Sequence, residues 1–199
     1  MCSSKRPLMR FLLDGMLGRL TRWLRIIGCE AWYSRDSSDD ELLRRAEQES
    51  LVLLTADVQL FRTAIAKSIE AFLVEGQYET ERLANVAVRF GLTLELDTTK
   101  SRCPVCGFAI RSVTKDQIAN LVPPTTFKVY QSFWICTNAS CAKVYWQGSH
   151  WKRIEETLVN SREILERKKF RDRGELSIPR RRTSARTTGT SSYKRVLEK

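Results

Sequence analysis

Short hydrophobic runs alternate with longer helix-like stretches along the first hundred residues of the chain. Four runs are typical of β-strands: residues 9–13, 30–34, 51–55 and 71–74. Each run is followed by a stretch with the pattern of a helix: residues 15–27, a stretch that begins at residue 39, residues 58–67 and residues 79–90. The third run, LVLLT, is unbroken and is therefore typical of a strand covered on both faces. This alternation predicts an α/β fold in which a parallel sheet is sandwiched between helices.

Several of these helices have residues that favour a helix end. Gly28 and Gly91 stand where the first and fourth helices are expected to stop, because glycine readily adopts the left-handed conformation of a C-terminal cap. Ser37 and Ser38 offer an N-terminal cap to the second helix, and its first turn is acidic. These signals place the helix limits independently of the hydrophobic pattern.

The chain changes character after about residue 98. Cysteine pairs, prolines and clustered aromatic residues occupy residues 103–151, and a charged helix is expected over residues 152–170. From residue 171 the chain is rich in Arg, Ser and Thr, which predicts a disordered basic tail. We therefore predict three parts: a sheet domain over residues 8–97, a cysteine-rich module over residues 98–154, and a charged helix with a basic tail over residues 155–199.

Charge is distributed unevenly over the 199 residues, whose formal net charge is +11. Residues 1–100 carry 14 basic and 15 acidic side chains, residues 101–155 carry seven and two, and residues 156–199 carry 13 and six. A neutral, acid-bearing domain beside basic segments is expected of an enzyme that acts on a polyanion. A basic surface that meets only solvent is the alternative interpretation.

No hydrophobic run approaches the roughly 18–20 residues that a membrane-spanning helix needs. The apolar stretch near the N-terminus is short and is interrupted by Asp14, so it does not match a secretory signal. We therefore expect an intracellular protein without a membrane partner. Cytoplasmic, nuclear and nucleolar locations all remain open.

Acidic residues follow three successive predicted strands. Asp14 comes directly after the first strand, Asp39 and Asp40 begin the helix after the second, and Asp57 follows the third. Because the carboxyl ends of parallel strands lie along one edge of a sheet, these acids are expected to converge there. Converging carboxylates repel, and Mg²⁺ or Mn²⁺ with its preference for oxygen ligands would offset that repulsion. Helix capping is the alternative role for each acid taken singly.

Four of the six cysteines form two close pairs, Cys103 with Cys106 and Cys136 with Cys141. Two such pairs separated by a few tens of residues match a four-cysteine zinc site of the ribbon type. Four thiolates fill a tetrahedron and leave no open position, so the predicted zinc is structural. Two disulfides or free thiols are the alternative. Cys2 and Cys29 have no pairing partner in the sequence pattern.

Several longer motifs resemble the Mut7-C ribonuclease domain, a branch of the PIN-like fold. The resemblance begins in two long stretches, FLLDGMLGRLTRWLRIIG and DDELLRRAEQESLVLLTAD. It continues through SRCPVCG, VPPTTF, FWIC and VYWQGSHWKRI and covers about residues 9–154. The resemblance implies a metal-dependent ribonuclease with its metal-binding acids at Asp14, Asp39 or its neighbour Asp40, and Asp57. One position departs from the family pattern, because Ala56 stands where a basic residue is common. A fourth acid that many PIN domains carry is not placed.

Candidate RNA-binding residues lie in both parts of the chain. Arg19, Arg22 and Arg25 share one face of the first predicted helix beyond Asp14, where they are expected either to hold phosphates or only to meet solvent. In the cysteine-rich module, Lys152, Arg153 and His150 are candidates for RNA contact, with His150 singled out by the GSHW motif of the family. Neighbouring aromatic residues would either stack on bases or fill a small core: Phe133, Trp134, Tyr145, Trp146 and Trp151. The basic run Arg180 to Arg182 predicts nonspecific RNA contact or a nuclear address.

These observations favour a ribonuclease that uses carboxylate-bound Mg²⁺ or Mn²⁺ to hydrolyse RNA, with a structural zinc ribbon and a basic tail that grip the substrate. The alternative is an RNA-binding or ribosome-associated protein that keeps the fold without catalysis. A third hypothesis, a protein-interaction adaptor, explains neither the acids nor the basic charge.

Overall fold

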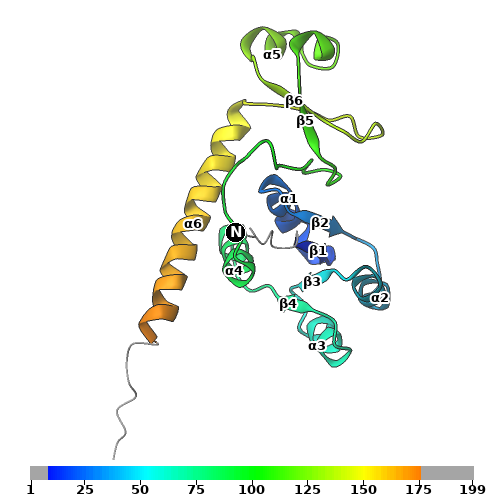
Figure 1. Cartoon of the computed structure of the whole chain (residues 1–199), viewed down its shortest axis with the longest axis vertical. Helices are drawn as coiled ribbons and strands as arrows, with labels where there is room; N and C mark the ends of the chain where they lie inside the picture. Colours follow the sequence, from blue (N-terminus) through cyan, green and yellow to red (C-terminus); the bar gives the residue numbers. More distant parts are fainter. Residues whose placement is uncertain (1–8, 176–199) are drawn as a thin grey trace, which may run out of the picture.

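The structure is a computed structural model that describes residues 9–175, with side chains placed for residues 9–171. Its first part alternates strands and helices as the sequence predicts, and the elements are, in chain order, β1 (Arg10–Leu13), the short 3-10 helix η1 (Gly15–Leu17), α1 (Gly18–Ile26), β2 (Glu30–Tyr33), α2 (Asp39–Glu49), β3 (Val52–Thr55), α3 (Val58–Ala66), β4 (Ala71–Leu73) and α4 (Glu79–Phe90). The four strands form one parallel sheet in the order β2-β1-β3-β4. The predicted α/β architecture is therefore confirmed, and helices flank the sheet (Figure 1).

Alternate side chains of the central strands enter two separate cores. Phe11 and Leu13 of β1 pack on the side of α1 and α4, whereas Leu12 packs on the side of α2 and α3. Strand β3 divides in the same way and is buried at all four positions, as its unbroken apolar run predicts. Strand register then aligns the carboxyl ends, because Leu13 pairs with both Tyr33 of β2 and Leu54 of β3. Residues that follow these three strands therefore share one edge of the sheet.

The cysteine-rich part, hereafter the ribbon, is a separate small sheet. It contains β5 (Ile110–Val113), the 3-10 helix η2 (Lys115–Ile118), α5 (Pro124–Val129), β6 (Phe133–Cys136) and β7 (Val144–Trp146), and its three strands are antiparallel in the order β5-β6-β7. Phe133 is completely buried and forms the ribbon core with Ile118 and Val122. Of the two roles considered for Phe133, the structure therefore supports core packing and not base stacking.

A long helix connects the ribbon back to the sheet. Helix α6 (Ser149–Glu175) begins beside the ribbon and runs along α4, to which its buried Leu158 and Leu165 contribute core contacts (Figure 1). The predicted charged helix is thus present but longer than residues 152–170, and residues 171–175, predicted as tail, are helical. The rest of the predicted tail, including Arg180 to Arg182, lies outside the described residues, as does Cys2. Within the described range, no helix combines the length and the hydrophobicity that crossing a membrane would require.

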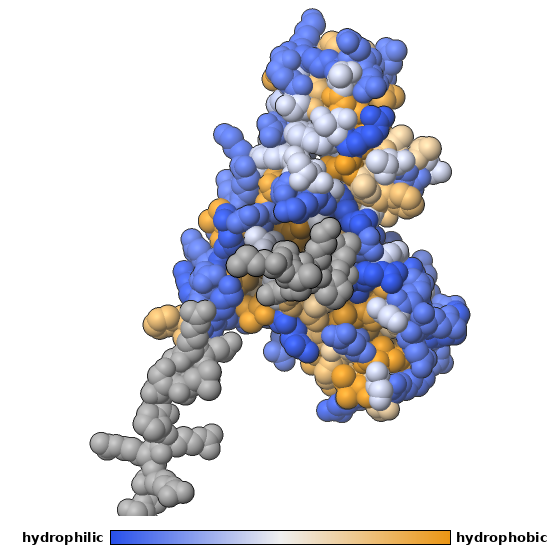
Figure 2. Space-filling view, viewed as in Figure 1, coloured by the Kyte–Doolittle hydropathy of each residue, from blue (hydrophilic) through white to orange (hydrophobic). Residues whose placement is uncertain are grey.

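Most of the surface seen in Figure 2 is hydrophilic, in keeping with the 29% of charged residues in the chain. Hydrophobic residues reach the surface over the ribbon and over the lower part of the sheet unit in that view. Exposed hydrophobic residues that are scattered singly are common, but contiguous ones mark candidate binding surfaces.

Candidate active site and zinc centre

Asp14 is a buried carboxylate at the carboxyl end of β1. Only 4% of its surface is exposed. Its Oδ1 atom accepts a hydrogen bond from the backbone N–H of Met16 at 2.8 Å, which starts the short helix η1. Its Oδ2 atom accepts one hydrogen bond from the hydroxyl of Thr55 and another, at 3.2 Å, from the backbone N–H of Ala56. Three donors thus hold this carboxylate in place between two neighbouring strands.

Asp57 is linked to Asp14 through Thr55. The Thr55 hydroxyl donates to Asp14 and accepts from the backbone N–H of Asp57 at 2.9 Å. Asp57 itself is exposed and caps α3, because its Oδ1 atom accepts from the N–H groups of Gln59 and Leu60. Its Oδ2 atom receives no hydrogen bond from the described part of the chain. The capping role and a role in the site are therefore compatible, since each uses a different oxygen.

Asp39 and Asp40 stand in the exposed first turn of α2, at the same sheet edge. The helix is capped by Ser38, one of the two serines predicted for this task, in a capping box with Glu41. Within residues 9–171, the carboxylates of Asp14, Asp39 and Asp57 do not form a group with all ligand atoms inside 4.8 Å; only the four cysteines do so. The acids share an edge but are not packed together as a ready-made cage.

A basic cleft of about 790 Å³ lies beside this edge. Its walls come from η1, α1, the loop after β2, the start of α4 and the ribbon turn between Cys103 and Cys106, and its charged lining residues are Arg19, Arg22, Arg25, Arg35, Glu79 and Arg82. The side chains of Arg19, Arg22 and Arg35 form no hydrogen bond or ion pair with the part of the chain that is described. Gly15 lets the loop approach closely, because a Cβ atom there would lie 2.8 Å from the carbonyl oxygen of Arg35.

Arg25 differs from the two arginines that precede it on α1. Its side chain is buried, with 7% of the residue exposed. Its Nε atom donates to the carbonyl of Ala31, and its Nη1 atom donates to the carbonyls of Pro104 and Val105 at 3.1 and 2.9 Å. These bonds use the Nε and Nη1 atoms of the guanidinium group. Arg25 therefore has a structural role, because it fastens the ribbon turn to the sheet unit, and its contact with phosphate stays a prediction.

The four cysteines of the ribbon are arranged to hold one metal ion. Their sulfur atoms all lie within 4.8 Å of one another, with Cys103 and Cys141 separated by 3.8 Å and Cys106 and Cys136 by 3.3 Å. A tetrahedron with zinc–sulfur bonds of about 2.3 Å has edges of about 3.8 Å between sulfurs, so the set fits Zn²⁺. All four are free cysteines, which agrees with metal ligation and not with the disulfide alternative.

The surroundings of Cys103 favour its thiolate form. Burial acts to raise its pKa, but hydrogen bonds from Tyr145 and from backbone N–H groups outweigh it and lower the pKa to about 7. The Tyr145 hydroxyl lies 3.0 Å from the sulfur. Burial and the neighbouring thiols raise the pKa of Tyr145, so the hydroxyl stays protonated and donates. A half-buried side chain from β7 therefore supports this candidate metal ligand.

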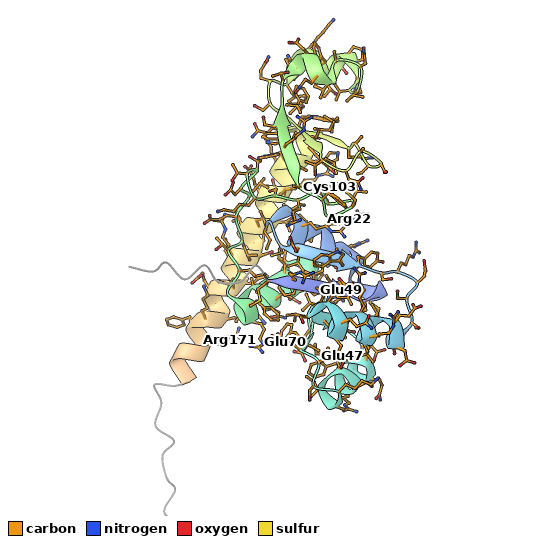
Figure 3. All side chains as sticks on the ribbon, turned by 45° about the vertical axis from the view of Figure 1, so that its right-hand side comes forward. Arg22, Glu47, Glu49, Glu70, Cys103 and Arg171 are labelled. Atoms are coloured by element: carbon orange, nitrogen blue, oxygen red, sulfur yellow. The ribbon has the colours of Figure 1, made fainter. Side chains whose placement is uncertain are left out.

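The remaining predicted contacts lie where the ribbon meets α6. His150, Lys152 and Arg153 are all exposed in the first turns of that helix. His150 is not part of the cysteine cluster, in agreement with a site already filled by four thiolates. Figure 3 places Arg22 and Cys103 close together at the boundary between the sheet unit and the ribbon. The basic cleft and the four-cysteine cluster are therefore neighbours.

The roles of four residues in the site were not expected from the sequence. Thr55 joins two acids, and its position two residues before Asp57 was the available signal. Arg35 and Arg82 line the cleft but lie in separate segments, so no local pattern pairs them with Arg19. Tyr145 contacts the sulfur of Cys103, but in the sequence it stands out only as one of several clustered aromatic residues.

Residues 9–158 match the family model described as the Mut7-C RNAse domain. Searches among curated proteins and among solved structures return no match. The family match points to a ribonuclease-like function and hence to an RNA substrate.

Proposed function

Because the chain belongs to the Mut7-C RNAse domain family, we propose that it hydrolyses RNA at the sheet edge that carries Asp14 and Asp57. The observation that carries this proposal is the buried Asp14, held by Thr55 beside Asp57 and next to the arginine-lined cleft. Three hydrogen bonds offset the cost of burying this carboxylate, and they hold it at the edge where sites form in parallel sheets. The PIN-like assignment is part of the same proposal.

A divalent cation is proposed at this edge. The donor set is suited to Mg²⁺ or Mn²⁺, because both prefer oxygen ligands and Mg²⁺ often binds through one or two carboxylates while keeping several waters. Asp14 and the free Oδ2 atom of Asp57 would hold it, with Asp39 or Asp40 from α2. Such a cation would make water a better nucleophile and stabilise charge on a phosphodiester.

The chain's own residues would bind and orient the RNA. Arg19, Arg22 and Arg35 line the cleft with guanidinium groups that are unpaired within residues 9–171, and guanidinium groups bind phosphate in a bidentate manner. Lys152, Arg153 and His150 would extend the contact onto the ribbon side. Zinc would hold the ribbon in shape without taking part in the reaction, since four thiolates leave no open position.

The test compares cleavage of labelled single-stranded and structured RNA with added Mg²⁺, added Mn²⁺ or neither. Asp14→Asn and Asp57→Asn are expected to slow cleavage by at least about 100-fold, because each removes a charged oxygen ligand. Asp36→Asn is the matched control, since Asp36 is an exposed acid in the loop before α2 and outside the proposed set. Comparing Asp39→Asn with Asp40→Asn assigns the third acid.

RNA binding is measured in parallel by fluorescence anisotropy. Arg22→Met is expected to weaken binding and to reduce its salt dependence, because one phosphate contact is lost. Wild-type rates in both Asp14→Asn and Asp57→Asn would contradict the assignment of the site. Binding without cleavage under every cation would favour the alternative of a non-catalytic or ribosome-associated RNA-binding protein.

A further inference from the structure

A second hollow, of about 390 Å³, lies between the ribbon and the start of α6. Its aromatic lining comes from the loop after α5, from β6, from β7 and from α6, and these residues are Tyr130, Trp134, Tyr145, Trp146 and Trp151. We call it the aromatic pocket. Its volume is within the range of about 300–1,000 Å³ typical of small-ligand sites, which are mostly lined by hydrophobic and aromatic side chains.

The rings of this pocket are held in position by the fold. The rings of Trp134 and Trp151 stack, with centroids 5.7 Å apart and an interplanar angle of 22°. The indole N–H of Trp151 donates to Glu155 at 3.0 Å, and the hydroxyl of Tyr145 lies against Cys103. The ring centroids of Tyr130 and Trp146 lie 6.4 Å apart. A planar ligand would therefore meet rings that are already ordered, which lowers the entropic cost of binding.

The segment that forms most of the pocket is basic, although Arg102, which lines the pocket, is paired with Glu30. Residues 101–155 carry seven basic and two acidic side chains. One of the two acids, Glu155, is engaged by Trp151, whereas Lys152 and Arg153 are exposed and form no ion pair within the described residues. An aromatic floor beside free cations is the combination that binds single-stranded nucleic acid, with bases stacked on rings and phosphates held by cations.

The pocket is also placed to receive RNA from the basic cleft. Pro104, in the turn between Cys103 and Cys106, lines both hollows. The two sites therefore lie on either side of one zinc-stabilised turn. A strand whose phosphates lie along Arg19 and Arg22 would have to cross only this turn to reach the rings.

We propose that the aromatic pocket binds an unpaired nucleobase of the RNA substrate, so that the protein selects single-stranded over fully paired RNA. This inference rests on the proposed function, because it takes RNA as the ligand. Base capture on one side of the zinc turn would fix which phosphate lies at the carboxylate edge on the other. The ribbon then acts as a substrate-positioning module in addition to a basic surface.

The experiment measures anisotropy of a short labelled single-stranded RNA in buffer without Mg²⁺ or Mn²⁺, together with a series in which each base in turn is replaced by an abasic site. In the wild type, affinity is expected to fall about 5- to 150-fold at one position of the series, because one stacked base is lost. Trp151→Leu is expected to bind the intact RNA with a similar loss and to show no further loss across the abasic series.

Two further variants make the result specific. Thr98→Phe keeps every ring but fills the pocket that Thr98 lines, so it is expected to weaken binding like Trp151→Leu. Phe170→Leu is the matched control, because Phe170 is an aromatic residue of α6 with 78% exposure that does not line the pocket. Zinc content and thermal unfolding verify folding, and Thr98→Phe carries the test if Trp151→Leu loses zinc.

A flat abasic series in the wild type would overturn the proposal, as would wild-type affinity in both Trp151→Leu and Thr98→Phe. Either result together with metal-dependent cleavage by the wild type would leave the ribonuclease proposal intact. A wild type that binds no RNA would refute both proposals.

Discussion

Replacing Arg25 by methionine tests whether this arginine fastens the zinc turn to the sheet unit. The substitution removes three hydrogen bonds that the guanidinium donates to carbonyl oxygens. Hydrogen bonds from a charged group contribute about 1.5–3 kcal/mol each, but relief from burying the charge offsets part of the loss. We expect a net loss of about 2–4 kcal/mol. For a chain of this size that corresponds to a fall in Tm of roughly 5–15 °C.

The assay is thermal unfolding followed by circular dichroism on zinc-loaded protein, with zinc release to a chromogenic chelator as a second readout. Arg22→Met is the matched control, because it makes the same change one turn earlier on α1. The Arg22 side chain is exposed and forms no hydrogen bond within the described residues. Its stability is expected to change by less than about 0.5 kcal/mol. Faster zinc release is expected only for Arg25→Met. Equal melting temperatures for the two variants would refute the role assigned to Arg25.

Three other predictions follow from the chemistry of the chain. Cys106→Ser is expected to release the single zinc ion and unfold the ribbon, measured by metal analysis and by loss of tryptophan fluorescence; retention of one zinc per chain would contradict it. Deleting residues 176–199, which hold seven basic residues and one acidic residue, is expected to weaken RNA binding and lower its salt slope, while an unchanged slope would exclude contact by this segment. Burial raises the pKa of Cys29 to about 12, so the thiolate is scarce at pH 8. Iodoacetamide is therefore expected to alkylate Cys29 only after unfolding. Labelling of native Cys29 at the rate of a free thiol would contradict this expectation.

The sheet unit could be predicted well because its signals are local. Four apolar runs and the spacing of leucines between them specify strands and helices, and Gly91 ends α4 in the left-handed conformation, at φ 64°. Cys103 and its three partners could also be assigned from spacing, because only a few folds bring two such pairs together.

The roles of individual charged residues could not be predicted in the same way. Arg19, Arg22 and Arg25 share one helical spacing, yet Arg25 alone is buried, because the ribbon turn returns to that position from 79 residues further along the chain. Likewise, mutual repulsion was expected at Asp14, but its carboxylate accepts three hydrogen bonds. Both outcomes depend on contacts between distant segments, and a periodic pattern in the sequence contains no information about such contacts.

The return of α6 onto α4 has a consequence for how the chain folds. Leu158 and Leu165 complete a core whose other members all precede residue 95, so the sheet unit is discontinuous in sequence and the ribbon is inserted within it. During synthesis, the part of α4 that packs on α6 stays uncovered until about 70 further residues, including the whole ribbon, have left the ribosome. A chain that ends near residue 150 would keep all the candidate acids and cysteines but expose that part of α4, and it should aggregate. Zinc uptake by the ribbon would then precede the last step of packing in the sheet unit, because the ribbon emerges before α6 can dock.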